Sequence, residues 1–173
     1  LAFASSPDYN LKPFKGPVEQ KQWDQWNNDS RTPLLNRVIS GEYPPGSVFK
    51  LITAALLLKE NKENIKYNCS GTHELGISQE GKSEFKRCWN PLGHGTINLA
   101  EALRVSCNVY FYKAIENITF DHLAEISKEF NFGNKIGIDL PSERKGLIPT
   151  TEYMRKKYEY KDKNGKWTVN WAR

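Results

Sequence analysis

The chain has 173 residues, of which 38% are apolar and 26% charged, and its 25 Lys and Arg against 20 Asp and Glu give a net charge of +5. This composition is typical of a globular domain with a sizeable core and excludes a disordered or fibrous chain. No apolar run reaches the ~18 residues of a membrane span, and no recognition motif accompanies the positive charge, so we expect no nucleic-acid partner. The first residues lack the basic start of a signal peptide, which places any anchor or export signal outside this chain.

The first half of the chain predicts two helices and an irregular segment. Apolar residues in "TPLLNRVIS" follow a helical period and predict a helix that ends near Gly41. The stretch "GEYPPGSVFKLITAALLLKE" predicts a helix from about Ser47 to Lys59 that is apolar nearly all round, and therefore buried. From Tyr67 to Gly95 no period is sustained, which favours an irregular excursion with one hairpin.

Three further helices are predicted in the second half. "NLAEALRVS" begins with Asn98, and Glu101 three residues later completes the spacing of a capping box. "NVYFYKAIENI" follows directly on Cys107, and "FDHLAEISKEFNFG" is closed by Gly133. "GIDLPSERKGLIPT" is expected to be a loop with short extended pieces.

The pair Ser47 and Lys50 suggests a nucleophile beside its base. Residues three apart share one face of a helix, so the hydroxyl and the amine can approach each other. A lysine accepts a proton only when neutral, and burial beside an apolar helix favours that form. The free amides of the helix N-terminus would stabilise an alkoxide on Ser47. The alternative is that Ser47 merely caps the helix and Lys50 is an ordinary surface lysine.

A second motif, the S-x-N tripeptide Ser106, Cys107 and Asn108, lies between two predicted helices. Together the motifs resemble those of the penicillin-recognising acyl-serine transferases. The stretches "ASSPDYNLKPF", "GEYPPGSVFK", "GHGTINLAEALRVSCNVYFY" and "GIDLPSERKGLIPT", in that order, are similar to the transpeptidase domain of class B penicillin-binding proteins, and more narrowly to its elongation-type members.

The resemblance implies the α+β, serine β-lactamase-like transpeptidase fold, an antiparallel sheet flanked by helices. Residues 1–173 would form a partial, mostly helical transpeptidase domain that lacks the later strands. Ser47 would be acylated, Lys50 would be the base, Ser106 would relay protons, and Asn108 would orient the lysine and the substrate amide. The family's K-T-G triad is absent from the chain and is expected after Arg173.

The implied activity is a D,D-transpeptidase that crosslinks peptidoglycan stem peptides during cell-wall elongation and is acylated by β-lactams, with no cofactor for catalysis. Partners expected from the family are a glycosyltransferase and a scaffold of the elongation complex. The location would be the periplasmic face of the inner membrane, with an N-terminal anchor helix outside this chain. Two alternatives share Ser47 and Lys50: a hydrolytic β-lactamase or carboxypeptidase, and a non-catalytic β-lactam sensor or scaffold domain.

Cys69, Cys88, His94 and Cys107 are the chain's three cysteines and one of its three histidines. Sulfur and imidazole ligands suit tetrahedral Zn²⁺, and some members of the family carry a metal in this segment, so a structural zinc site is one hypothesis. Free buried cysteines, or a Cys69–Cys88 disulfide with Cys107 left over, are the others. His122 is expected to be solvated on a helix, and His73 is expected to lie in an exposed loop.

Overall fold

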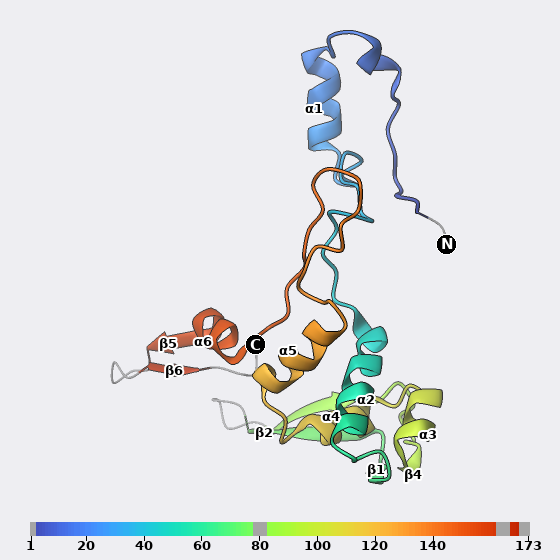
Figure 1. Cartoon of the computed structure of the whole chain (residues 1–173), viewed down its shortest axis with the longest axis vertical. Coiled ribbons are helices and arrows are strands. Elements are labelled where there is room, and N and C mark those ends of the chain that lie inside the picture. Colours follow the sequence, from blue (N-terminus) through green and yellow to red (C-terminus); the bar gives the residue numbers. More distant parts are fainter. Residues whose placement is uncertain (1–2, 78–82, 162–166, 170–173) are drawn as a thin grey trace. The chain divides into compact units, whose positions relative to one another are not determined.

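The computed structural model describes residues 3–77, 83–161 and 167–169. The chain divides into two units, one made of Leu1–Pro44 with Gly133–Leu147 and the other of Pro45–Phe132 with Ile148–Arg173. Figure 1 shows the elements of both. No helix within the described ranges is long and apolar enough to cross a membrane.

The first unit contains the 3-10 helix η1 (Lys12–Lys15) and the helix α1 (Gln20–Asn28). Aromatic rings hold these two elements together. The rings of Phe14 and Trp26 stack with their centroids 5.5 Å apart, and Trp23 meets both of them edge-on. Trp26 is buried, so this small cluster is the core of the segment around α1.

The helix predicted before Gly41 is wrong, because these residues form a series of turns. Side chains compete there for the backbone groups that a helix would use. The Asn36 Oδ1 accepts the N–H of Val38, and the Ser5 hydroxyl accepts the N–H of Arg37. The Asn36 contact is a local side-chain-to-backbone bond that favours turns over helix, and together with the distant Ser5 contact it outweighs the apolar period.

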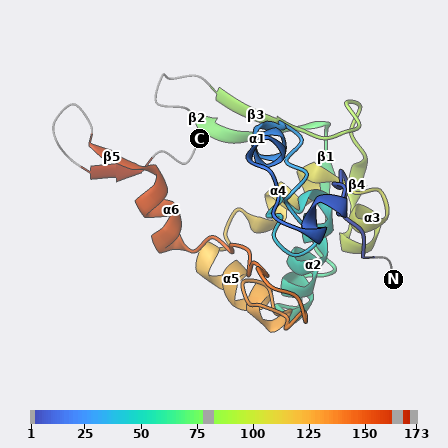
Figure 2. The same ribbon diagram turned by 90° about the horizontal axis from the view of Figure 1, so that it is seen from above.

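The second unit carries the motifs. Its helical elements are η2 (Gly46–Phe49), α2 (Lys50–Lys59), α3 (Leu99–Arg104), α4 (Asn108–Ile115), α5 (Phe120–Glu129) and α6 (Thr151–Tyr158). Its strands are β1 (Tyr67–Cys69), β2 (Thr72–Ile77), β3 (Ser83–Arg87), β4 (Gly95–Ile97), β5 (Glu159–Lys161) and β6 (Trp167–Val169). They pair antiparallel as β1–β4, β2–β3 and β5–β6, and Figure 2 shows β2 and β3 side by side. The hairpin predicted between Tyr67 and Gly95 is confirmed as β2–β3.

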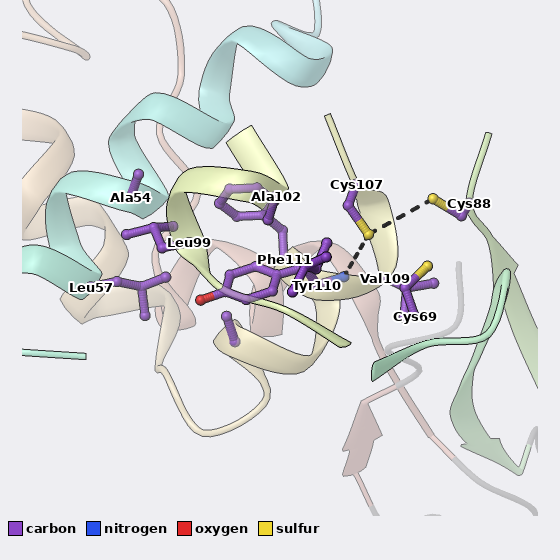
Figure 3. Packing of buried hydrophobic residues seen from close by; sticks show 12 residues of the cluster. Ala54, Leu57, Cys69, Cys88, Leu99, Ala102, Cys107, Val109, Tyr110 and Phe111 are labelled. Carbon is purple, nitrogen blue, oxygen red and sulfur yellow. Dashed lines mark hydrogen bonds between the residues drawn. The ribbon is translucent and has the colours of Figure 1, made fainter. Parts of the chain in front are cut away.

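The core of the second unit is built around α4 (Figure 3). Tyr110 is fully buried, and its hydroxyl donates to the carbonyl of Ile65 at 3.0 Å. Residues of α2 and α3 pack on the same cluster, among them Ala54, Leu57 and Ala102. Because the S-x-N tripeptide runs directly into α4, this packing also fixes the position of that motif.

Helix α2 is only partly buried, although its sequence predicted burial on all sides. Ile52, Leu56 and Leu57 are buried, and the first two pack toward Ile126 of α5. Leu51 is 61% exposed and Leu58 56%. The apolar side chains of α2 are therefore not all buried within the described part of the chain.

Candidate active site

Ser47 lies on the 3-10 turn that leads into α2. Gly46 begins the turn with a φ of +57°, a left-handed conformation that glycine adopts without steric cost. The α-helix starts at Lys50, one turn after Ser47. Ser47 is exposed and Lys50 is half-buried. The turn therefore presents the hydroxyl to solvent, while it directs the lysine stem inward.

Helix α3 ends in a Schellman motif that includes Ser106 and Cys107, the first two residues of the S-x-N tripeptide. The Ser106 N–H donates to the Leu103 carbonyl at 3.1 Å, and the Cys107 N–H donates to the Ala102 carbonyl at 2.9 Å. Ser106 has a φ of +50°, at the position that glycine usually occupies in this motif. A non-glycine residue there costs about 1–2 kcal/mol. Serine, unlike glycine, places a hydroxyl group at this position of the turn.

The amine of Lys50 has three partners, all in the S-x-N motif. Its Nζ lies 2.8 Å from the Ser106 carbonyl oxygen, 2.7 Å from Asn108 Oδ1 and 3.0 Å from Ser106 Oγ. The carbonyl and amide oxygens can only accept, so they occupy two N–H groups. A neutral amine then has its lone pair left for the Ser106 hydroxyl. An ammonium that donates to all three oxygens and a neutral amine that accepts from the Ser106 hydroxyl both fit these contacts.

The link from Lys50 to the nucleophile runs through Ser106. The two hydroxyl oxygens, Ser106 Oγ and Ser47 Oγ, are 3.2 Å apart. Ser47 can donate to Ser106, and Ser106 can donate to Lys50, which gives a continuous path for a proton. The sequence argument placed the amine directly beside Ser47. In the structure the Ser106 hydroxyl lies within hydrogen-bonding distance of both groups.

Asn108 is oriented by one partner on each side of its amide. Its Oδ1 accepts from Lys50, and its Nδ2 lies 3.4 Å from the backbone carbonyl of Arg87 at the end of β3. Because the carbonyl of Arg87 can only accept, it favours the amide orientation that directs Oδ1 toward the lysine.

Burial lowers the pKa of Lys50 from its ordinary value of 10.5, and the nearby Cys107 and Cys88 thiols oppose this effect. The Lys50 Nζ also lies 5.7 Å from the centroid of the buried Phe111 ring. Desolvation is the largest effect, so the pKa of Lys50 lies below its usual range even though the nearby oxygen acceptors favour the charged amine.

The three cysteines and His94 converge at one point of the second unit. Their ligand atoms all lie within 4.8 Å of one another. The His94 Nδ1 is 3.6 Å from the sulfurs of both Cys69 and Cys88, and the sulfurs of Cys88 and Cys107 are 4.0 Å apart (Figure 3 shows the three cysteines). Tetrahedral zinc with Zn–S ≈ 2.3 Å and Zn–N ≈ 2.0 Å would separate such atoms by about 3.5–3.8 Å. The donor set and its spacing fit a zinc ion.

The three thiols of the cluster differ in how readily they ionise. All three cysteines are free thiols in the structure. The pKa of Cys88 is lowered: burial acts against this, but backbone N–H groups, among them those of Asn108 and Asn90, outweigh it by bonding the sulfur. Burial raises the pKa of Cys107 to about 12. The Nε2 of His94 is buried without a hydrogen-bond partner, whereas its Nδ1 faces the sulfurs.

The comparisons with known proteins show the family of the chain. The family model of the penicillin-binding protein transpeptidase domain matches residues 1–169. The chain belongs to the penicillin-binding protein transpeptidase family. The peptidoglycan D,D-transpeptidase MrdA of Acinetobacter baumannii is 33% identical over 88% of this chain, and that of Escherichia coli K12 is 32% identical over 92%.

A solved complex of the penicillin-binding protein PBP2 with MreC from Helicobacter pylori is 37% identical to this chain, with a TM-score of 0.77 over 88% of it and 28% of that chain. This match confirms the predicted transpeptidase fold. The chain spans about a quarter of the length of the curated relatives, 22% of the Acinetobacter protein and 25% of the Escherichia protein.

All the residues singled out from the sequence come together in two adjacent groups of this transpeptidase-family chain. Ser47, Lys50, Ser106 and Asn108 form one, and Cys69, Cys88, His94 and Cys107 form the other. Cys107 joins them, because it is the central residue of the S-x-N motif. Sequence reasoning missed Arg87, which contacts Asn108 of the S-x-N motif, and Trp89, which contacts Val105 directly before it. Neither belongs to a motif, so no local signal marked them.

Proposed function

We propose that the chain is part of a peptidoglycan D,D-transpeptidase of the elongation type, which crosslinks stem peptides through an ester on Ser47. The observation that carries the proposal is the chain of contacts from Ser47 through Ser106 to Lys50. A serine hydroxyl is a weak nucleophile unless a base takes its proton as it attacks. Here a half-buried amine with a lowered pKa can receive that proton through one hydroxyl.

The reaction would begin as Ser47 Oγ attacks the peptide carbonyl next to a terminal D-Ala. The proton of Ser47 passes to Ser106 Oγ, and that of Ser106 passes to the Lys50 amine. When the tetrahedral intermediate collapses, the C–N bond breaks and the departing D-Ala amine takes the proton back from Lys50. An amine of a second stem peptide then attacks the ester, and Ser47 regains its proton. A β-lactam would acylate the same oxygen as its ring amide opens.

The proposal is tested by labelling the full-length protein with a fluorescent penicillin. We expect covalent label on the wild-type protein, none on Ser47→Ala, and wild-type label on Ser30→Ala, an exposed serine of the first unit. Unchanged labelling of Ser47→Ala would contradict the assignment. Labelling alone does not distinguish a transpeptidase from a hydrolase or a sensor.

Two further measurements separate these alternatives. Rapid release of the acyl group would indicate a β-lactamase or carboxypeptidase, whereas a long-lived ester is expected of a transpeptidase or a sensor. Crosslinking of purified stem peptides by the full-length protein then separates those two. A stable ester without any crosslinked product would favour the sensor.

The proposed setting is the periplasmic face of the inner membrane, with an anchor helix outside this chain. A scaffold protein is proposed as a partner because the related Helicobacter pylori protein was solved in complex with MreC. A glycosyltransferase is proposed as the second partner, because the crosslinked peptides must be carried on newly polymerised glycan strands.

We also propose one structural zinc ion on Cys69, Cys88, His94 and Cys107. Four protein ligands leave no position for a substrate or a water molecule, so the ion would hold the Tyr67–Gly95 segment together and take no part in acyl transfer. The tight turns of this segment support that role. A Cβ at Gly93 would lie 2.1 Å from the Cys69 carbonyl oxygen, so the backbone at Gly93 packs closely against the strand that carries Cys69.

A further inference from the structure

Trp89 contacts Val105, the residue directly before the S-x-N motif, although it is not part of either motif. It follows Cys88 directly, and its indole N–H donates to the carbonyl of Val105 at 2.8 Å. The residue is 64% exposed, so burial of the ring does not account for its position. What this side chain contributes to the described structure is the hydrogen bond and a ring contact.

The hydrogen bond reaches a backbone group that the turn itself leaves open. The Schellman motif uses the carbonyls of Ala102 and Leu103 for the N–H groups of Cys107 and Ser106. Val105 is the C-cap of α3, and its carbonyl finds its partner outside the helix, in Trp89.

This carbonyl belongs to the peptide unit that determines the orientation of Ser106. The Val105 carbonyl and the Ser106 N–H are the two ends of one planar peptide. Trp89 holds the carbonyl end, and the Leu103 carbonyl holds the N–H end at 3.1 Å. With both ends held, the plane cannot rotate, and Ser106 keeps its φ of +50°.

The hydroxyl of Ser106 is sensitive to such a rotation. It must stay 3.0 Å from Lys50 and 3.2 Å from Ser47 at the same time to pass a proton between them. A tilt of the preceding peptide would move Oγ toward one partner and away from the other. Residues that hold a positive φ in place are therefore expected around this turn.

The ring of Trp89 also links the turn to the cysteine cluster. Its centroid lies 5.2 Å from that of His94, with the planes tilted by 58°. The backbone N–H of Cys88 donates to the Gly71 carbonyl at 2.8 Å, which fixes the start of the Trp89 loop. Trp89 thus reaches the carbonyl of Val105 from the residue after Cys88, whose backbone is held by Gly71.

We propose that Trp89 is a positioning residue for acylation, because its indole N–H holds the Val105–Ser106 peptide that places the Ser106 hydroxyl between Lys50 and Ser47. Trp89 does not touch the reacting atoms in this account. The proposal rests on the acyl-serine function proposed above. It makes a specific kinetic claim: loss of the N–H should slow the acylation step and leave the preceding binding step unchanged.

The test compares Trp89→Phe with Leu92→Ala in the full-length protein. Phe keeps an aromatic ring beside His94 and removes the N–H, whereas Leu92 lies in the same loop and is 91% exposed. Rapid mixing with a chromogenic cephalosporin at several concentrations separates the limiting acylation rate from the dissociation constant of the first complex. We expect Trp89→Phe to lower the limiting rate by about 3 to 10 fold, the effect of one hydrogen bond, with the dissociation constant within about 2 fold of wild type.

A second variant tests the loss of the N–H without the change of ring size that Trp89→Phe introduces. The benzothiophene analogue of tryptophan, incorporated at position 89, keeps the bicyclic shape and replaces the N–H by sulfur, so it should show the same slow acylation. Melting temperature and metal content should match wild type in both variants. The proposal would be overturned by an unchanged limiting acylation rate in the Trp89 variants or by an equal loss of rate in Leu92→Ala. It would also be overturned if the rate falls only together with the melting temperature or the metal content. Absence of acylation in the wild-type protein would instead refute the proposed function.

Discussion

Ser106→Gly and Ser106→Ala should have the same effect on catalysis and different effects on stability. Both remove the hydroxyl that lies between Lys50 and Ser47. Removal of a positioned proton-transfer group typically costs 10²–10⁴ fold, so we expect both variants to acylate more slowly by about that range. The backbone contact between Lys50 and the Ser106 carbonyl survives in both.

The difference in stability follows from the φ of +50° at Ser106. Alanine in the left-handed region keeps the steric cost of a Cβ, about 1–2 kcal/mol, whereas glycine has none. Glycine loses about 0.4–1 kcal/mol of this advantage through the greater freedom of its unfolded chain. From the midpoints of these two ranges, the glycine variant should be more stable than the alanine variant by about 0.8 kcal/mol, or about 2–3 °C in melting temperature for a cooperative unit of 150–250 residues.

The assay pairs stopped-flow acylation by a chromogenic cephalosporin with thermal unfolding of the same preparations. Near-normal acylation by Ser106→Gly would show that the hydroxyl is no relay, whatever happens to Ser106→Ala. If the alanine variant melts at or above the temperature of the glycine variant, the argument from the left-handed Schellman position fails. The two results test independent steps, because catalysis depends on Oγ and stability on Cβ.

Lys50→Arg should abolish acylation, because a guanidinium does not lose its proton in a protein; a near-normal rate of penicillin labelling would identify another base. The acylation rate of the wild-type protein should rise with pH and reach a plateau above an apparent pKa that lies below 10.5, since the neutral Lys50 amine would be the base and burial lowers its pKa. An acylation rate that falls as the pH rises would contradict a neutral lysine as the base. Asn108→Ala should slow acylation by about 10²–10⁴ fold without unfolding the protein. A decrease in the acylation rate of less than about 3 fold would indicate that the Asn108 amide has only a structural role. Chelation, or Cys88→Ser, should lower the melting temperature and the acylation rate together, while a reducing agent alone does neither; elemental analysis that finds well under one zinc per chain, or a mapped Cys69–Cys88 disulfide, would refute the metal site.

The parts of the fold that depend on neighbours in sequence could be predicted. The capping box of Asn98 and Glu101 is present with both of its hydrogen bonds, because it needs only four consecutive residues. The helices after Cys107 and Thr119 begin within a residue of their expected positions. The S-x-x-K pair is local in the same sense, since Ser47 and Lys50 stand one turn apart whatever surrounds them.

The contacts that join distant segments could not be predicted in the same way. Trp89 contacts Val105 from a loop, and Arg87 contacts Asn108 from the end of β3, and no periodicity in the sequence indicates either contact. His73 was expected in an exposed loop, but it is 8% exposed on β2, with its ring stacked on Tyr112 of α4. A polar segment gave no sign that one of its residues would be covered by a helix from the next part of the chain.

The middle residue of the S-x-N motif explains why two groups of functional residues adjoin. Cys107 has extended backbone between the left-handed Ser106 and the helical Asn108, and its neighbours both contact Lys50. The Cys107 side chain is fully buried instead, where its sulfur accepts the N–H of Tyr110 at 3.3 Å and lies 4.0 Å from the sulfur of Cys88. A residue at this position must cap α4 and pack in the core, and a thiol can do both. Any movement of Cys107 would shift Ser106 and Asn108 with it, because all three share one continuous backbone turn. The cysteine cluster therefore constrains the position of the two residues that contact Lys50.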